Sequence, residues 1–265
     1  MPNIKKSQKI NPELKARIIE QIKKRSGPMF AIFDFDNTCI VNDITEATLT
    51  YICKNRLLRD FSLLDGDNTD IDLYHKKFIQ TYYQLLKDGK IFDGYLLIVK
   101  MFSGFTKKEA EHIVLQTIKS EGKNIGSSKL YGVKIAHGLK VQSNIISLIN
   151  YLKLNKIKVH ILSASSEIAV AVATKYFKID TDNIIGMKHI IKNGIITSSF
   201  KKPYSILGGK VDCMRKYISR TKSPLLVADD SNTGISILET SSIKVVVNRN
   251  NELTKIAKKR KWFLI

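Results

Sequence analysis

Acidic and hydroxyl side chains follow three separate apolar runs of the sequence. Asp34 and Asp36 follow the first run, Ser163 the second, and Asp229 and Asp230 the third. If they gather at one place, the carboxylates repel one another unless a cation neutralises them, and Mg²⁺ suits an all-oxygen site that also holds water and a phosphate. An aspartate beside that ion can attack phosphorus and form an aspartyl phosphate, which water then hydrolyses. These residue types therefore predict metal-assisted phosphoryl chemistry.

The apolar runs that precede these residues have the length and boundaries of buried strands. They span residues 29–33, 159–162 and 224–228, and a fourth run spans 243–247. Amphipathic helical spacing alternates with the strands at 142–154, 167–176 and 235–239. Repeated strand–loop–helix units predict an α/β, Rossmann-like parallel sheet with helices on both faces. Because such sheets bind ligands at the carboxyl ends of their strands, the polar residues are expected to share one edge.

The region between the first two strands has a different pattern. Residues 43–135 contain little strand pattern and several amphipathic helical segments, at 46–57, 73–86, 94–102 and 107–119. We therefore predict a core domain formed by 1–42 and 136–265, with a helical cap domain inserted at 43–135. Asn193-Gly194, between two apolar pairs, predicts a β-hairpin within the core.

The polar segments resemble, in order and spacing, the four motifs of the haloacid dehalogenase (HAD) superfamily of aspartate-nucleophile phosphatases. The resemblance covers about residues 29–250 and rests on Asp34-Phe35-Asp36-Asn37-Thr38, Ser163, Gly208-Gly209-Lys210 and Asp229-Asp230-Ser231-Asn232. It implies that Asp34 is the nucleophile and a Mg²⁺ ligand. It also implies that Asp36 protonates the leaving alcohol, then activates water, and binds the metal through its backbone carbonyl.

The second and third motifs supply groups for the phosphoryl oxygens. The resemblance implies that Ser163 hydrogen-bonds these oxygens and that Lys210 neutralises charge on them and on Asp34. Lys201 and Lys202 lie nearby, but the Gly-Gly-Lys setting at the start of a predicted helix favours Lys210. Helix capping is the competing interpretation for hydroxyls in this region, and it can be the whole role of Ser165 or Ser166.

The fourth motif departs from the pattern of many family members. Gly234 stands where a later aspartate would fall when Asp230 is aligned with the metal ligand. We expect Asp229 and Asp230 to complete the Mg²⁺ shell together, and on this alignment Asp230 ranks above Asp229 as the direct ligand.

Two branches of the superfamily are especially similar to this sequence. Residues 34–43 follow the phosphoserine phosphatases closely, and Asp43 sits where those enzymes use a carboxylate that meets the substrate amine. Residues 138–186 look like phosphorylcholine phosphatases. Both similarities imply a phosphate ester of a small amino alcohol as substrate, although Asp43 also suits a simple helix cap.

The charge balance leaves other functions open. The chain has 265 residues and a net charge of +20, and its 43% hydrophobic content excludes an acidic disordered chain. Residues 1–25 contain eight basic and two acidic residues, and residues 248–265 contain six basic residues and one acidic residue. Much of the excess positive charge therefore lies in the two end segments. A non-enzymatic protein that binds nucleic acid or anionic lipid is compatible with this charge, but no specific nucleic-acid motif accompanies it.

The remaining features concern location and partners. Residues 255–265 could make weak contact with an anionic membrane, but we favour packing of this aromatic segment on the sheet. The three scattered cysteines and the absence of an apolar leader or a long apolar run predict a cytoplasmic protein, with export by another kind of signal left open. A protein or phosphotyrosine phosphatase is the main enzymatic alternative. The insertion of about 90 residues favours a small phosphate ester, since it can cover a small pocket. The sequence leaves the oligomeric state open.

Overall fold

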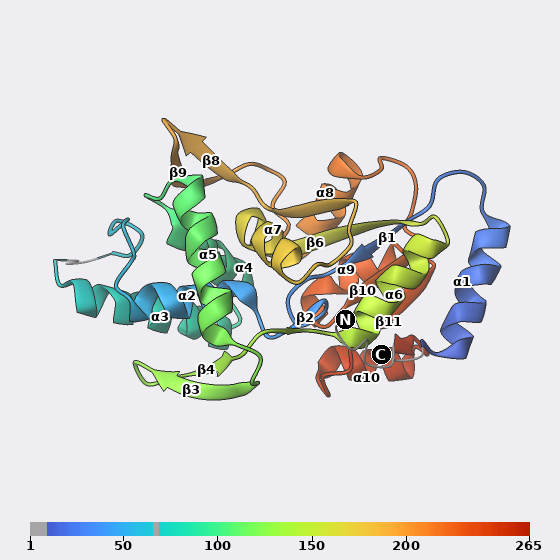
Figure 1. Cartoon of the computed structure of the whole chain (residues 1–265), viewed down its shortest axis with the longest axis horizontal. Helices are drawn as coiled ribbons and strands as arrows, with labels where there is room; N and C mark the ends of the chain where they lie inside the picture. Colours follow the sequence, from blue (N-terminus) through green and yellow to red (C-terminus); the bar gives the residue numbers. More distant parts are fainter. Residues whose placement is uncertain (1–9, 66–68) are drawn as a thin grey trace, which may run out of the picture.

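A six-stranded parallel sheet forms the centre of the protein (Figure 1). The computed structural model describes residues 10–65 and 69–265. Residues 1–9, with which the predicted core domain and its basic N-terminal segment begin, lie outside the described residues. The strand order is β12 (Phe263–Leu264), β11 (Ile243–Val246), β10 (Leu226–Asp229), β1 (Phe30–Phe33), β6 (Lys158–Ser166) and β7 (Asn183–Met187). This topology confirms the predicted α/β fold class.

Helices cover both faces of the sheet. One face carries α1 (Pro12–Lys24), α6 (Ser143–Leu154) and α7 (Glu167–Tyr176), and the other carries α8 (Gly209–Tyr217), α9 (Ile235–Glu239) and α10 (Glu252–Lys259). The side chains of β1 alternate between the two cores: Ala31 and Phe33 pack in the first, and Phe30 and Ile32 in the second. All four are buried, as expected for a central parallel strand.

A helical region lies beside the sheet, on the left in Figure 1. It contains α2 (Ile44–Lys54), α3 (Ile71–Lys87), α4 (Ile91–Val99) with the short 3₁₀ helix η1 (Lys100–Phe102), and α5 (Lys107–Glu121). These elements match the four predicted helical segments. Beyond the prediction, the hairpin of β3 (Gly126–Leu130) and β4 (Val133–His137) follows α5. The side chains of β3 are mostly exposed, so the sequence there has no apolar alternation to reveal a strand. The domain boundaries themselves stay predictions.

Paired strands and a hairpin connect the helical region to the rest of the molecule. The chain enters and leaves it through β2 (Ile40–Val41) and β5 (Lys140–Val141), which pair antiparallel. The hairpin of β8 (His189–Lys192) and β9 (Ile195–Phe200) forms the second contact. There the Gly104 amide donates to the Ile196 carbonyl at 2.9 Å, and the Ile196 amide donates to Phe105 at 2.8 Å.

The β8–β9 hairpin turns at the predicted Asn-Gly pair. Asn193 has φ = 50° and Gly194 has φ = 79°. A two-residue turn of this type needs positive φ at both positions, which Asn and Gly adopt most readily.

The second predicted strand ends later than expected, so the predicted end was wrong. We expected a loop from Ser163 onward, but β6 continues to Ser166, and its register against β7 shifts between Leu162 and Ser166. The last residues of this strand are mostly serines, so they lack the apolar pattern from which a strand is predicted. The helix α1 was not predicted from the sequence.

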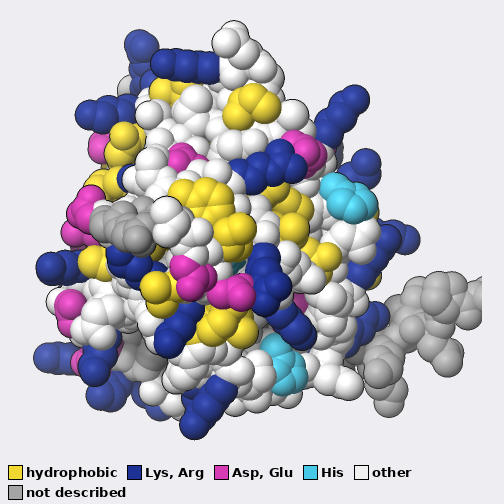
Figure 2. Space-filling model, turned by 90° about the vertical axis from the view of Figure 1, so that its left-hand side faces the viewer, with side chains coloured by type: hydrophobic (Ala, Val, Ile, Leu, Met, Phe, Trp, Pro, Cys, Tyr) yellow, Lys and Arg dark blue, Asp and Glu magenta, His cyan; other side chains and the backbone are white. Residues whose placement is uncertain are grey.

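The C-terminal segment packs on the sheet, as we favoured. β12 adds an edge strand parallel to β11, and Trp262 and Leu264 pack against the second core. Over residues 10–65 and 69–265, none of the helices has both the length and the apolar composition that a membrane crossing requires. On the face of the helical region shown in Figure 2, Lys and Arg side chains lie among acidic and apolar ones rather than in one basic patch.

Candidate active site

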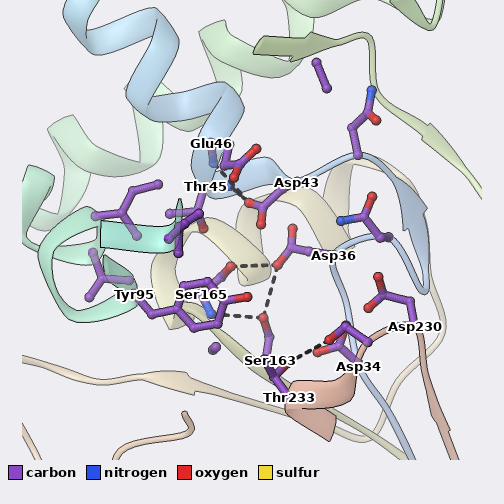
Figure 3. Close-up of a pocket in the computed structure, with 18 of the residues that line it drawn as sticks. Asp34, Asp36, Asp43, Thr45, Glu46, Tyr95, Ser163, Ser165, Asp230 and Thr233 are labelled. Atoms are coloured by element: carbon purple, nitrogen blue, oxygen red, sulfur yellow. Dashed lines mark hydrogen bonds between the residues drawn. The ribbon is translucent and has the colours of Figure 1, made fainter. Parts of the chain in front are cut away.

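The ends of three adjacent strands bring the predicted site residues together (Figure 3). β1 lies between β6 and β10, and Phe33 is in register with Ile161 on one side and Ala228 on the other. The residues that follow therefore share the carboxyl edge of the sheet. They border a cavity of about 280 Å³ that also reaches the helical region. Asp34 and Asp36 are each 8% exposed.

Lys210 forms ion pairs with two of these carboxylates. Its Nζ lies 2.8 Å from Asp34 Oδ1 and 2.9 Å from Asp229 Oδ2, and the residue is 2% exposed. Burial alone would lower the pKa of Lys210, but the charges of Asp229 and Asp34 outweigh it and raise the pKa, so the ammonium form persists. Lys201 and Lys202, the nearby alternatives, are exposed.

The start of α8 positions this lysine. A Cβ on Gly209 would lie 2.0 Å from the Tyr204 carbonyl oxygen, so only glycine allows the chain to approach so closely before Lys210. This contact explains the glycine that directly precedes Lys210.

Asp34, Asp229 and Asp230 form a group suited to a metal ion. One carboxylate oxygen from each lies within 4.8 Å of the others, and all three residues are buried. Burial raises the pKa of Asp34 well above its usual value, with further increases from Asp229 and Asp230 and an opposing effect of Lys210. Burial, followed by the charge of Asp229, raises the pKa of Asp230 to about 6. A buried set of oxygen ligands with excess negative charge fits Mg²⁺.

Asp229 and Asp230 differ in how many of their carboxylate oxygens accept hydrogen bonds. Asp229 Oδ1 accepts from the amides of Asp230 and Ser231 at 2.9 and 3.2 Å, and its Oδ2 accepts from Lys210. Asp230 Oδ2 accepts from Arg249 at 2.6 Å, whereas its Oδ1 receives no hydrogen bond from the described residues. Asp230 therefore has an oxygen available for a metal ion.

Gly234 leaves room for the Asp229 carboxylate. A Cβ at this position would lie 2.0 Å from Asp229 Oδ2. The departure from the family pattern therefore has a local cause: the space beside Gly234 is taken up by the carboxylate of Asp229.

Asp36 is held by three hydrogen bonds between the sheet and α2. Its Oδ1 accepts from the Ile44 amide at 2.8 Å, and its Oδ2 accepts from the hydroxyls of Ser165 at 2.6 Å and Ser163 at 3.2 Å. Burial raises the pKa of Asp36, and the bonds from Ser165 and Ile44 oppose that rise. A carboxyl group with a raised pKa can donate a proton near neutral pH.

The capping interpretation of the two later serines is wrong. The Ser165 hydroxyl donates to Asp36, and Ser166, which does stand at the N-cap of α7, makes no side-chain cap bond. Ser166 Oγ instead lies 3.0 Å from His189 Nε2. Because the strand extends to Ser166, these two hydroxyls contact Asp36 and His189 instead of the amides at the start of α7.

The start of α2 forms the opposite end of the cavity. Asp43 caps the helix, with Oδ1 accepting from the amides of Thr45 at 2.7 Å and Glu46 at 3.0 Å, and it also lines the cavity. Both interpretations of Asp43 therefore fit its geometry. Burial raises the pKa of Asp43 well above its usual value, and the charges of Asp36 and Glu46 add to the rise.

Several residues at this end were missed by the sequence analysis. Glu46 Oε1 accepts from the Tyr82 hydroxyl at 2.8 Å, and Tyr95 lines the same space. Thr45 is 2% exposed, and its Oγ1 has no hydrogen-bond partner among the described residues. Glu46 could have been found from the sequence, because it lies in the first turn of the helix that begins after Asp43. Nothing in the local sequence singled out Tyr95.

Arg249 was also missed. It lines the cavity and forms the ion pair with Asp230. It follows β11, the neighbour of β10, so the rule that ligands bind at the carboxyl ends of strands could have found it.

Comparison with known proteins agrees with this geometry. No protein-family model matches the chain. Phosphorylcholine phosphatase from Pseudomonas aeruginosa is 29% identical, over 76% of this chain and 68% of that protein. Among solved structures, a conserved protein of unknown function from Anaerococcus prevotii has a TM-score of 0.70 at 20% identity, covering 96% of this chain and 92% of that one. A substrate-bound phosphoserine phosphatase has a TM-score of 0.56 at 14% identity, covering 91% and 94%. The two structures show a shared fold. Together with the four ordered motifs, the 29% identical relative makes the chain similar to phosphatases of the haloacid dehalogenase type.

Proposed function

We propose that the protein is a Mg²⁺-dependent phosphomonoesterase that acts through an aspartyl phosphate on a small phosphorylated amino alcohol, such as phosphocholine or phosphoserine. The observation that carries this proposal is the buried cluster in which Lys210 bridges Asp34 and Asp229. Asp34, Asp230 and Asp229, with the backbone carbonyl of Asp36, are the proposed ligands of the ion. The bound ion supplies positive charge to the phosphoryl oxygens and to the attacking carboxylate.

In the first step, an oxygen of Asp34 bonds to phosphorus and the bond from phosphorus to the ester oxygen breaks. Asp36 gives its proton to the departing alkoxide, which leaves as the alcohol. Lys210 and the Ser163 hydroxyl stabilise the phosphoryl oxygens as negative charge moves onto them.

In the second step, Asp36 removes a proton from a water molecule as that water attacks the phosphorus. The bond between phosphorus and Asp34 breaks, inorganic phosphate leaves, and Asp36 is again protonated. The raised pKa of Asp36 supports its alternation between acid and base.

The substrate class is supported by the α2 end of the cavity. Asp43 and Glu46 place two carboxylates there, and neither forms a salt bridge with a described residue. A substrate ammonium group would supply the missing positive charge. A cavity of about 280 Å³ suits a small ester better than a phosphotyrosine peptide. We further propose that residues 43–135 act as the cap domain that covers this cavity.

The experiment is a turnover assay of purified protein against phosphocholine, phosphoserine, a phosphotyrosine peptide, a nucleotide and a sugar phosphate. We expect small amino-alcohol esters to be preferred, Asp34→Asn to lower turnover at least about 10³-fold, and excess chelator to stop the reaction until Mg²⁺ is restored. The control is Asp88→Asn, which changes an exposed aspartate and should leave turnover unchanged. Retained turnover in Asp34→Asn would refute the nucleophile, and retained turnover in chelator would refute the metal.

A further inference from the structure

Arg249 contacts a proposed metal ligand although it lies outside the four motifs. Its Nη1 is 2.6 Å from Asp230 Oδ2, and its side chain is 43% exposed at the cavity while that of Asp230 is 6% exposed. The contact therefore joins a partly solvated cation to a buried carboxylate. Such an arrangement can fix the orientation of the carboxylate without closing the cavity.

The loop that carries Arg249 is itself fixed against Asp230. Asn251 Nδ2 donates to the Asp230 carbonyl at 2.7 Å, and the Asn251 side chain also caps α10 by accepting from the Thr254 amide at 3.0 Å. The Arg249 amide donates to Thr254 Oγ1 at 3.3 Å. Two neighbouring residues of one loop thus hold both the backbone and the side chain of Asp230.

The charges at this edge of the sheet favour a divalent ion even with Arg249 in place. Three buried carboxylates, Asp34, Asp229 and Asp230, pair with the two cations Lys210 and Arg249. When all three are ionised, one negative charge remains, which attracts a divalent ion. Because Arg249 binds only Oδ2, it leaves Oδ1 of Asp230 available and does not take the place of the ion.

We propose that Arg249 is a positioning residue of the metal site: it holds Asp230 in the orientation in which the carboxylate binds the ion. This inference rests on the proposed Mg²⁺ site. Partners that orient a metal ligand from outside the coordination shell typically contribute about 10- to 100-fold to metal affinity. In this chain the C-terminal unit of β11, α10 and β12 would therefore support the metal site as well as complete the sheet.

The test is calorimetric titration of metal-free protein with Mg²⁺, which needs no turnover. We expect Arg249→Met to weaken Mg²⁺ binding about 10- to 100-fold, and Arg249→Lys to fall between it and the wild type, because lysine keeps the charge but not the planar geometry. Arg260→Met is the matched control: Arg260 pairs with Glu239 at 2.6 Å on the surface, and its loss should leave Mg²⁺ affinity unchanged.

The possible outcomes separate the two proposals. If the wild type binds no Mg²⁺, the proposed metal-dependent function fails. If the wild type binds Mg²⁺ and Arg249→Met binds it equally well or more tightly, the positioning role is refuted and the proposed function stands. Circular dichroism in chelator checks that each variant folds. Should Arg249→Met not fold, Arg249→Gln replaces it and is expected to weaken binding by the same range.

Discussion

The two ends of the cavity contain the same kind of side chain in opposite electrostatic situations. At the sheet edge, Asp34 and Asp229 share Lys210, and Asp230 pairs with Arg249. At the start of α2, Asp43 and Glu46 accept hydrogen bonds from amides and from Tyr82 but form no salt bridge within the described residues. Figure 3 shows both groups facing the same space, with Asp36 between them.

This difference suggests which cation completes each end. In the proposed function, the sheet edge has fixed cations of its own and takes a further small, hard ion that binds carboxylate oxygens and phosphate together. At the α2 end no described residue forms a salt bridge with Asp43 or Glu46, and the charge of Arg249 acts on Glu46 only from a distance. Aromatic side chains lie beside these acids, an environment that suits an organic ammonium group. In the proposed function, the metal therefore comes from solution and the second cation arrives as part of the substrate.

The largest expected effect comes from removing the cation at the sheet edge. In Lys210→Met, two buried carboxylates lose their partner, which we expect to destabilise the protein by about 3–5 kcal/mol and to lower turnover at least about 10³-fold. Denaturant unfolding in chelator and a turnover assay with Mg²⁺ measure the two effects. Lys202→Met, at an exposed position, is the control and should change neither. A Lys210→Met protein of wild-type stability would contradict the pairing described above.

A smaller and more selective effect is expected at the α2 end. Glu46→Gln keeps an oxygen for the Tyr82 hydroxyl but removes the negative charge. We expect KM for phosphocholine to rise about 10-fold, a loss of about 1.4 kcal/mol, while KM for glycerol phosphate, which has no amine, stays the same. An equal rise for both esters would show that Glu46 shapes the cavity rather than binding the amine.

The smallest effect is a pH dependence of stability from the same substitution. Burial raises the pKa of Glu46, and hydrogen bonds from Tyr82 and Tyr83 only partly oppose the rise. The folded state therefore holds this proton more tightly than the unfolded state, so wild-type stability falls as pH rises from about 4.5 through the folded-state pKa. Glu46→Gln lacks this loss. Its stability relative to the wild type should increase over that range and then level off, as followed by denaturant unfolding from pH 4 to pH 8. A difference that does not vary with pH would contradict the raised pKa.

Much of the architecture could be predicted because it depends on local patterns. The apolar run ending at Phe33 and the helical spacing at 235–239 were assigned correctly, since burial in a parallel sheet or against one demands continuous or periodic apolar residues. The hairpin at Asn193-Gly194 could be predicted equally well from its local sequence. By contrast, β3 is mostly exposed and the end of β6 is polar, so neither carries the apolar pattern on which such predictions depend.

The site shows the same division. The sequence by itself determined which side chains follow each strand, and the rule for parallel sheets then predicted that Asp34, Ser163 and Asp230 would share an edge. Only the tertiary structure decided the partners: Lys210 pairs with Asp34, 176 positions away in the chain, and Arg249 pairs with Asp230 from the loop after the neighbouring strand. Tyr95 joins the cavity because α4 packs near the sheet edge. Strand order and local periodicity are properties of short segments, whereas charge pairing and cavity walls depend on where distant segments meet.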